Sequence, residues 1–243
     1  MITTVHSIPS YSQKLQLKRF IEEVLDQQHF MAVWKNNPDP NRLVVVKPNW
    51  VQEAHEYKPD VWEPVITHPI LVWAVIQVLA ERMQGTGTIC LCDAPHTYAN
   101  FEGIVARGDL RGKLEDVRRR WPSLKLEVLD LRREIWLRKD EVVVARQPNI
   151  EDPRGYVKIN LGRESLFYGY RGEGRYYGAD YDAGVVRAHH RGEIQEYLLA
   201  GTPIACDALC LSGKRAQRPK KPPLSGQNWR DLRKHLCNVW QEG

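Results

Sequence analysis

Polar side chains follow two apolar runs of this chain, and their types are those that bind small molecules. Lys47 and Asn49 follow the first run, and Asp93 and His96 follow the second. An ammonium and an amide can hold an anion, whereas a carboxylate and an imidazole can transfer protons or ligate a metal. The residue types predict a ligand site, but their spacing identifies no reaction.

The elements that must position these residues form a predicted βαβ unit. Residues 43–47 and 88–92 indicate two buried strands, because they are mainly apolar and rich in β-branched residues or cysteine. The segment 69–84 between them is apolar almost all round and begins with proline, which predicts a buried helix. Ligands of open parallel sheets bind outside the carboxyl ends of the strands, so the polar residues should meet at one edge.

Two further candidates stand where the helix begins. Thr67 is placed to cap the helix, and the helix dipole should favour the neutral form of His68, which can act as a base or ligand. Each candidate also has a structural reading, such as a histidine that braces the cap, an aspartate that caps a turn or a lysine that snorkels from the sheet. The full set of candidate ligand-binding residues is Lys47, Asn49, Thr67, His68, Asp93 and His96.

A divalent metal is a further hypothesis, because nitrogen and oxygen ligands occur in several of the expected loops. No HExxH motif fixes their spacing, and no GxSxG motif supports a hydrolase. The five cysteines lack CxxC spacing, so we expect no iron–sulphur cluster in this chain. The candidate metal ligands are His68, Asp93, His96, His189 and His190, with His55 as an alternative.

Composition limits the class of protein. The chain has 243 residues and a net charge of +5, from 35 basic and 30 acidic side chains. We expect a protein without a membrane span and without a nucleic-acid interface, since the basic residues at 118–120 and 214–234 are not interleaved with aromatics. No leader segment is recognisable at the start, and we expect a cytoplasmic protein with reduced thiols.

The pattern along the chain predicts an α/β fold: a three-layer domain with a mainly parallel or mixed sheet over residues 1–211. Expected helices cover residues 12–28, 69–84 and 100–120, the last divided near Gly108. Expected strands cover 43–47, 88–92, 124–129 and 204–211, with a hairpin at 135–137 and 142–144, a strand or turn at 185–186 and a short apolar element at 194–199.

Two segments differ from the rest of the chain in amino-acid composition. Residues 147–183 are rich in glycine and tyrosine and contain one expected strand at 156–161, which favours an insertion that acts as a lid or binding loop. An irregular cap packed by its own tyrosines is equally consistent. Residues 212–243 are basic and poor in apolar side chains, so we expect a tail with little regular structure.

Four motifs in order carry a resemblance to a known family. Val46-Lys47-Pro48-Asn49, Thr67-His68-Pro69, Cys92-Asp93-Ala94-Pro95 and the segment 202–209 with Asp207 occur along the chain. Together they resemble the bacterial domain of unknown function 362 family over about residues 5–211. The resemblance implies an α/β domain without an established activity, which in some members is joined to iron–sulphur modules.

The chain departs from that family after residue 211. The family continues with a Pro-Lys-Leu-Lys-Thr-His segment and a glycine-bearing Leu-Lys-Asn, whereas residues 214–221 keep the basic charge but lack Thr-His. A shifted reading frame near Gln217, and hence a truncated product, is one hypothesis, which resequencing the gene would test. A divergent C-terminus is the alternative.

Two classes of function follow from these observations. In the first, the protein binds or processes a small anionic molecule at the strand ends, with the tyrosine-rich insertion closing over it. In the second, it is a non-catalytic binding or structural protein, or an inactive remnant, whose basic tail or tyrosine-rich loop contacts a macromolecular partner.

Overall fold

The computed structural model describes residues 11–27, 37–140, 142–169 and 183–211, which belong to two compact units. The larger one, here called the sheet unit, contains the described residues up to Gly155 together with those from Ala200 onward. The other, the small unit, contains the described residues between Tyr156 and Leu199. The small unit therefore begins inside the predicted insertion at 147–183 and extends beyond its end.

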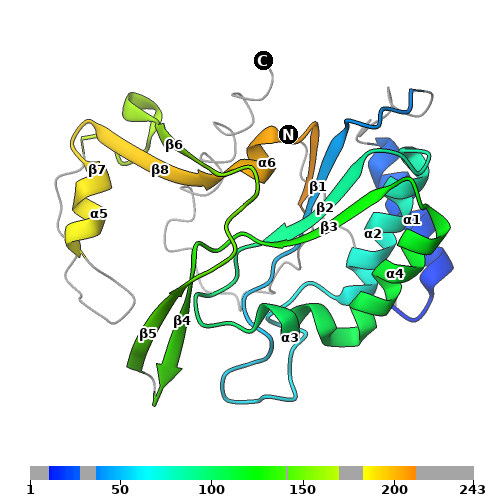
Figure 1. The fold of residues 1–243 in the computed structure, drawn as a ribbon, viewed down its shortest axis with the longest axis horizontal. Coiled ribbons are helices and arrows are strands. Elements are labelled where there is room, and N and C mark those ends of the chain that lie inside the picture. The colour runs from blue at the N-terminus through cyan, green and yellow to red at the C-terminus, as the bar shows by residue number, and fades with distance from the viewer. Residues whose placement is uncertain (1–10, 28–36, 141, 170–182, 212–243) are drawn as a thin grey trace, which may run out of the picture. The chain divides into compact units, whose positions relative to one another are not determined.

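The sheet unit is built on four parallel strands. Their order is β3-β2-β1-β9, and all three neighbouring pairs run in the same direction. The predicted α/β class with a mainly parallel sheet is thus confirmed (Figure 1). The bounds are β1 (Leu43–Lys47), β2 (Thr88–Asp93), β3 (Lys125–Asp130) and β9 (Ala208–Leu211).

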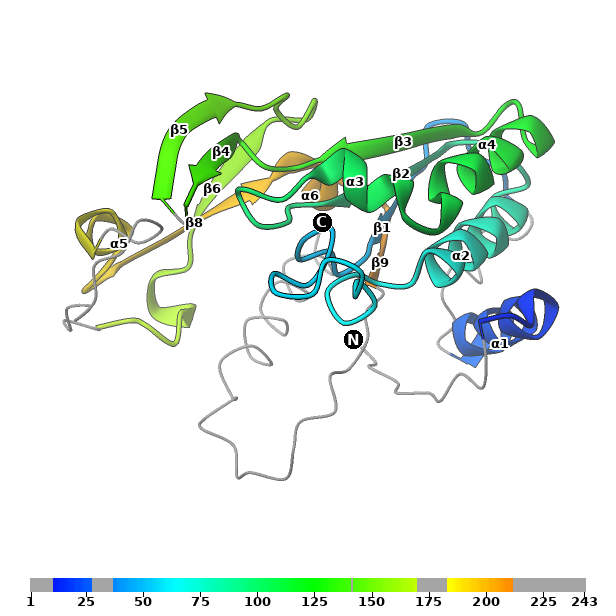
Figure 2. The same ribbon diagram turned by 90° about the horizontal axis from the view of Figure 1, so that it is seen from below.

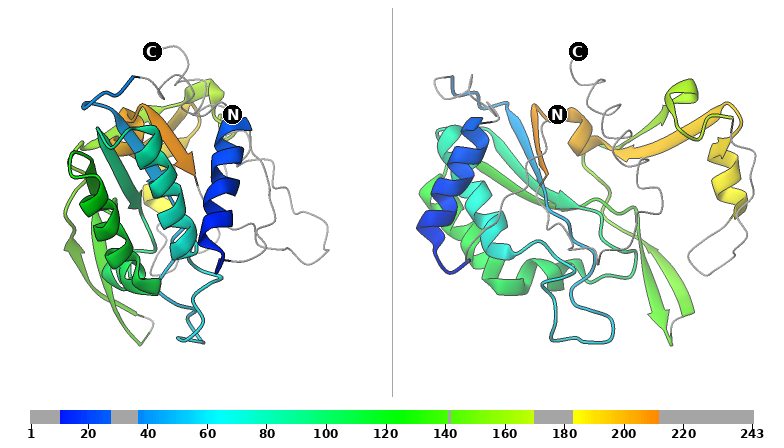
Figure 3. Two further views of the ribbon diagram at one scale, coloured as in Figure 1. Left: turned by 90° about the vertical axis from the view of Figure 1, so that its right-hand side faces the viewer. Right: turned by 180° about the vertical axis from the view of Figure 1, so that it is seen from behind.

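Helix α2 (Pro69–Arg82) lies on one side of this sheet, between α1 (Lys14–Gln27) and α4 (Leu110–Arg120), as Figures 2 and 3 show. Helix α2 is apolar almost all round because it contacts the sheet and both helices, as its sequence predicted. The α1 contact also includes ion pairs of Lys18 with Glu81 and of Asp26 with Arg82.

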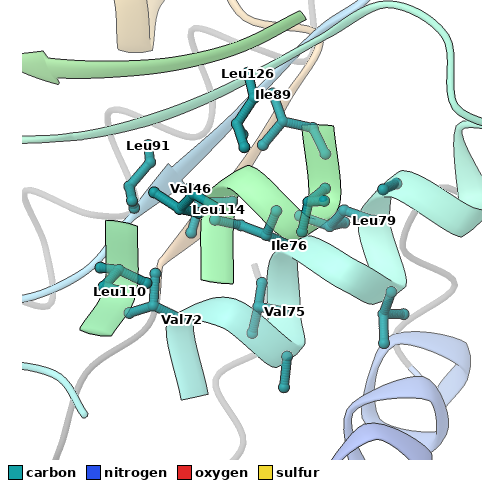
Figure 4. Close-up of a cluster of buried hydrophobic side chains, with 14 of the residues drawn as sticks. Val46, Val72, Val75, Ile76, Leu79, Ile89, Leu91, Leu110, Leu114 and Leu126 are labelled. Atoms are coloured by element: carbon teal, nitrogen blue, oxygen red, sulfur yellow. The ribbon is translucent and has the colours of Figure 1, made fainter. Parts of the chain in front are cut away.

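Alternate residues of the strands enter two separate apolar clusters. Val44 and Val46 of β1 join the large cluster under the helices, whereas Leu43 and Val45 face the opposite side. The large cluster is the main core, and its interior side chains interdigitate between sheet and helices (Figure 4). Its labelled members in that view are Val46, Val72, Val75, Ile76, Leu79, Ile89, Leu91, Leu110, Leu114 and Leu126.

The opposite face carries a thinner layer in which thiols take the place of larger apolar groups. Cys90, Cys92 and Cys206 are buried there with Leu43 and Val45. A hydrogen bond with Cys92 and burial raise the pKa of the Cys90 thiol well above its usual range. Burial, with the nearby Asp207 and Cys92, raises the pKa of Cys206 to about 11. These thiols act as small apolar groups in the packing.

A polar network ties α6 (Gly201–Ala205) to the loop before the small unit. The buried Asp152 accepts hydrogen bonds from the Thr202 backbone N–H at 2.8 Å and from its hydroxyl at 2.6 Å. Arg154 donates to the Thr202 hydroxyl and to Glu127. Burial alone would raise the pKa of the Glu127 carboxyl, but the hydrogen bonds and charges of Lys125 and Arg154 together lower it.

The connection from β2 to β3 is divided where the sequence predicted. It consists of α3 (Phe101–Ala106), the short 3-10 turn η2 (Arg107–Asp109) and α4. The break falls at Gly108, whose φ is 55°, a left-handed conformation that favours glycine.

Two smaller sheets contain the remaining strands of the described residues. The predicted hairpin is confirmed as β4 (Glu134–Lys139) and β5 (Val142–Pro148), with a bulge between Leu137 and Arg138. The small unit has a three-stranded sheet of order β6-β8-β7. Its elements are β6 (Tyr156–Asn160), which confirms the strand predicted inside the insertion, then η3 (Gly162–Glu164), α5 (Ala183–His189), β7 (His190–Arg191) and β8 (Ile194–Ala200).

Two local predictions were wrong. Residues 204–211 do not form one strand, because α6 covers Gly201–Ala205 and only Ala208–Leu211 joins the sheet. Proline suits the first turn of a helix, and Asp152 supplies the acceptor for the first-turn N–H of Thr202. Residues 185–186 lie in helix α5, so the strand preference of two valines is overridden by context. The predicted tail at 212–243 and the tyrosines between 170 and 182 lie outside the described residues.

Candidate functional site

Lys47 and Asp93 meet at the carboxyl ends of β1 and β2. The Lys47 Nζ lies 2.6 Å from the Asp93 Oδ1, and the same ammonium donates to the Pro48 carbonyl at 3.3 Å. The Asp93 side chain is 5% exposed, whereas the Lys47 side chain is 39% exposed. The pair therefore has one buried member and one that reaches solvent.

Asp93 also holds the loop that follows β1. Its Oδ2 accepts the Trp50 backbone N–H at 2.7 Å, and its Oδ1 accepts the Ala94 backbone N–H at 2.8 Å. Both carboxylate oxygens thus have charge-assisted hydrogen bonds, the stronger kind in proteins. Asp93 has the geometry of a positioning residue that fixes Lys47 and Trp50.

Asn49 and Thr67 fasten the two ends of the same loop. The Thr67 hydroxyl accepts the Asn49 backbone N–H at 2.9 Å and donates to the Asn49 carbonyl at 3.3 Å. The Thr67 backbone N–H also donates to that carbonyl, at 3.0 Å. Thr67 is buried and engaged with the loop, whereas Asn49 is exposed at the edge.

His68, rather than Thr67, is the N-cap of α2. Its Nδ1 accepts the Ile70 backbone N–H at 3.2 Å. Its ring stacks on Tyr11, with centroids 3.9 Å apart and planes 7° apart, and lies 5.4 Å from the Trp62 ring. Burial in this contact raises the pKa of the Tyr11 phenol. This arrangement matches the structural reading of His68, in which the histidine braces the helix start.

His96 is exposed at the edge and is tied to the neighbouring loops through its backbone. Its N–H donates to the Val51 carbonyl at 2.9 Å, which links the loop after β2 to the loop after β1. Its Nδ1 lies 2.9 Å from the Tyr98 hydroxyl, so the Nε2 is the nitrogen that remains for a ligand. The Arg138 guanidinium lies 4.3 Å from the centroid of the Tyr98 ring.

The residue that orders the loop after β2 was not foreseen from the sequence. Arg132 is buried, and its guanidinium donates to the carbonyls of His96, Thr97 and Ala99 at 2.7, 3.2 and 2.9 Å. Asp130 binds the same guanidinium through both carboxylate oxygens. Asp130 is the register partner of Asp93 and ends β3. The rule that ligands bind at the carboxyl ends of parallel strands pointed to β1 and β2, and applied to β3 it would have pointed to Asp130 as well.

The structure therefore brings together only some of the predicted site residues. Lys47 and Asp93 are in direct contact, and Asn49 and His96 lie on loops connected to them through Trp50 and Val51. Figure 1 shows these loops after β1 and β2 at the same end of the sheet. The side chains of Thr67 and His68 are engaged with the loop end and the helix start, as described above.

The candidate metal ligands are dispersed. His189 and His190 belong to the small unit, where the His189 Nδ1 lies 2.9 Å from Glu196. The hydrogen bond from His189, with the nearby Lys158, lowers the pKa of the Glu196 carboxyl. His55 accepts the Tyr57 backbone N–H within its own loop. Across the described ranges, no three His, Cys, Asp or Glu side chains are grouped in a way that could hold a metal ion.

Comparison of the chain with protein-family models, curated proteins and solved structures found no match. Among the helices of the described part of the chain, none has the length and apolar character needed to cross a membrane. The functional argument thus depends on the geometry of the strand ends.

Proposed function

We propose that the protein binds a small anionic molecule, a carboxylate or phosphate, at the carboxyl ends of β1 and β2. The observation that carries this proposal is the Lys47 ammonium, which is held in place by a buried carboxylate although the Lys47 side chain is 39% exposed. Two of its three N–H groups are used by Asp93 and Pro48, and the third has no partner among the described residues, so it can donate to a ligand. A fixed donor at a strand end is the kind of group that orients ligands in parallel sheets.

The charge balance indicates what else the ligand would need. Asp93 neutralises Lys47, so the pair offers a positioned hydrogen bond rather than a net positive charge. Further donors would come from the exposed Asn49 amide and from the His96 imidazole. We therefore expect weak binding of anions, carried by hydrogen bonds rather than by net charge.

The resemblance to the domain of unknown function 362 family supports the same residues. Lys47, Asn49 and Asp93 lie within the motifs that carry it. We propose membership of that bacterial family and a cytoplasmic location, for which the free thiols of Cys90, Cys92, Cys206 and Cys210 are the supporting observation.

The proposal is tested by a thermal-shift screen of anionic metabolites, with inorganic phosphate and succinate as first probes. A ligand at one hundred times its Kd stabilises the folded state by about 2.7 kcal/mol, enough for a clear shift. Lys47→Met should abolish the shift. Lys125→Met is the matched control, because Lys125 is also paired with a carboxylate, at 2.6 Å from Glu127, but lies at the start of β3.

Contact with a macromolecular partner is the second candidate, and one observation favours it. The hairpin of β4 and β5 exposes apolar side chains, with Leu137 at 41% and Val142 and Val144 at 60%. An exposed apolar strand is a common place for protein contacts. If no anion stabilises the protein while Val144→Lys weakens the capture of a partner, this second reading replaces the first.

A further inference from the structure

Among the described residues of the small unit, two buried polar side-chain atoms have no hydrogen-bond partner, and they belong to a cross-strand pair of residues. The atoms are the Gln195 Oε1 and the His190 Nδ1. His190 of β7 and Gln195 of β8 are directly opposite each other in the antiparallel register. Opposite residues of such a pair project from the same face, with Cβ atoms about 5 Å apart.

The orientation of the Gln195 amide is fixed by its other end. Its Nε2 donates to the carbonyls of Phe167 and Gly192 at 2.9 and 3.2 Å. A flipped amide would place an oxygen against these two carbonyl oxygens, so the acceptor must be the orphaned atom. Gln195 is fully buried, and an unsatisfied buried acceptor costs about 1–3 kcal/mol. Such a cost in a native fold calls for an explanation such as a bound group.

The aromatic rings of Phe167 and Tyr197 lie beside His190. The Tyr197 ring lies 4.9 Å from the His190 ring, and the Phe167 ring lies 6.2 Å from it, both tilted. Tyr197 is two residues beyond Gln195 and shares its face of β8. The Tyr197 hydroxyl is held by Ser165 at 2.9 Å, which fixes the ring.

We propose that His190 and Gln195 form a binding site for a ligand that carries a primary ammonium group. Gln195 offers only an acceptor, which an N–H group can satisfy and which repels an anionic oxygen. The His190 imidazole offers a second acceptor at Nδ1 in the tautomer that carries its proton on Nε2, and the negative faces of aromatic rings attract cations. The site is separate from the anion site proposed above and does not depend on it.

The test is a titration of the full-length ¹⁵N-labelled chain at neutral pH, followed through the histidine ring nitrogens by NMR. The probes are n-butylamine and n-butanol, which share a skeleton but differ in charge. We expect n-butylamine to shift the His190 Nδ1 resonance at concentrations at least tenfold lower than n-butanol. His190→Phe should keep the ring and weaken amine binding about tenfold, the usual value of one hydrogen bond.

The matched control is His189→Phe, since the Nδ1 of His189 is already engaged by Glu196, and amine binding should be unchanged. The proposal is overturned if n-butylamine leaves His190 unperturbed, if n-butanol is equally effective, or if His190→Phe binds the amine as well as the natural chain. The first two of these outcomes are measured on the natural chain alone. The proposal can therefore be refuted even if His190→Phe does not fold.

Discussion

Replacing Asp93 by alanine should destabilise the protein far more than replacing its partner Lys47. The carboxylate accepts three hydrogen bonds, from Lys47, from the Ala94 N–H and from the N–H of the buried Trp50. Its removal leaves the Trp50 N–H without an acceptor, at a cost of about 2 kcal/mol. The Ala94 N–H is on an exposed residue and can bond to water instead. The loss of the ion pair with the partly exposed Lys47 costs about 1 kcal/mol of stability at most.

The expected cost of Asp93→Ala is therefore about 3 kcal/mol, against about 1 kcal/mol for Lys47→Ala. The cost of Asp93→Asn should lie between these two values, because an amide keeps one acceptor oxygen but turns an N–H towards the other donors. In a chain of this size, 3 kcal/mol corresponds to a fall in Tm of roughly 6–12 °C.

Urea denaturation of the three variants and of the double variant measures these values. The coupling between the two residues should be about 0.5–1 kcal/mol, the part that belongs to the ion pair itself. Equal costs for the two alanine variants, or a cost for Asp93→Ala below about 1 kcal/mol, would refute the positioning role. That role also explains why Asp93→Ala is a poor probe of ligand binding and why Lys47→Met is preferred.

Four further predictions concern stability and reactivity. Gly201→Ala should cost about 2–3 kcal/mol in urea denaturation, because the new Cβ would lie 2.3 Å from the Arg154 carbonyl oxygen. Glu127 has a lowered folded-state pKa, so its stabilisation is present above the pKa of the unfolded chain and is lost as pH falls through the folded value. Glu127→Gln should therefore flatten the acid limb of a stability–pH curve, and an unchanged limb would contradict this. Arg132→Ala should cost about 3–5 kcal/mol and raise amide exchange at 96–99, whereas unchanged exchange would show that the arginine does not order the loop. The buried Cys206, whose pKa is raised to about 11, should react with iodoacetamide at pH 8 only in the unfolded chain, as mass spectrometry of the labelled protein would show.

The central strands and α2 could be predicted because each is specified by its own sequence. The run Leu43–Lys47 is apolar at consecutive positions, as a strand buried on both faces must be, and β1 contributes to both clusters. The segment from Pro69 has proline at the first turn and is apolar almost all round. Local pattern and tertiary burial agree in these elements.

The role of Asp93 could be predicted only in part. Its place after a buried strand indicated that it would lie at the sheet edge, and it does. Its choice of partners depends on the path of the loop after β1, which brings the Trp50 N–H to within 2.7 Å of Oδ2. No sequence pattern near residue 50 encodes that contact, because the two residues are 43 positions apart.

Long-range partners also explain the errors. Helix α6 depends on Asp152, fifty residues earlier, to accept the Thr202 N–H, so the segment looked like the start of a strand. Arg132 could not be predicted because an arginine after a strand usually faces solvent, whereas Asp130 and three backbone carbonyls bind this one. The position of His68 directly before Pro69 would have predicted a helix cap, and His68 is the N-cap of α2.

The proposed function is tested most directly by an NMR titration of the ¹⁵N-labelled protein with inorganic phosphate and with succinate. The account predicts that the amide signals of Trp50 and Ala94, which bond to Asp93, and of His96 shift together with one saturating curve. The shifts should be lost in Lys47→Met but kept in Lys125→Met. If neither anion moves these signals, or if the shifts persist in Lys47→Met, the strand ends of β1 and β2 are not an anion site.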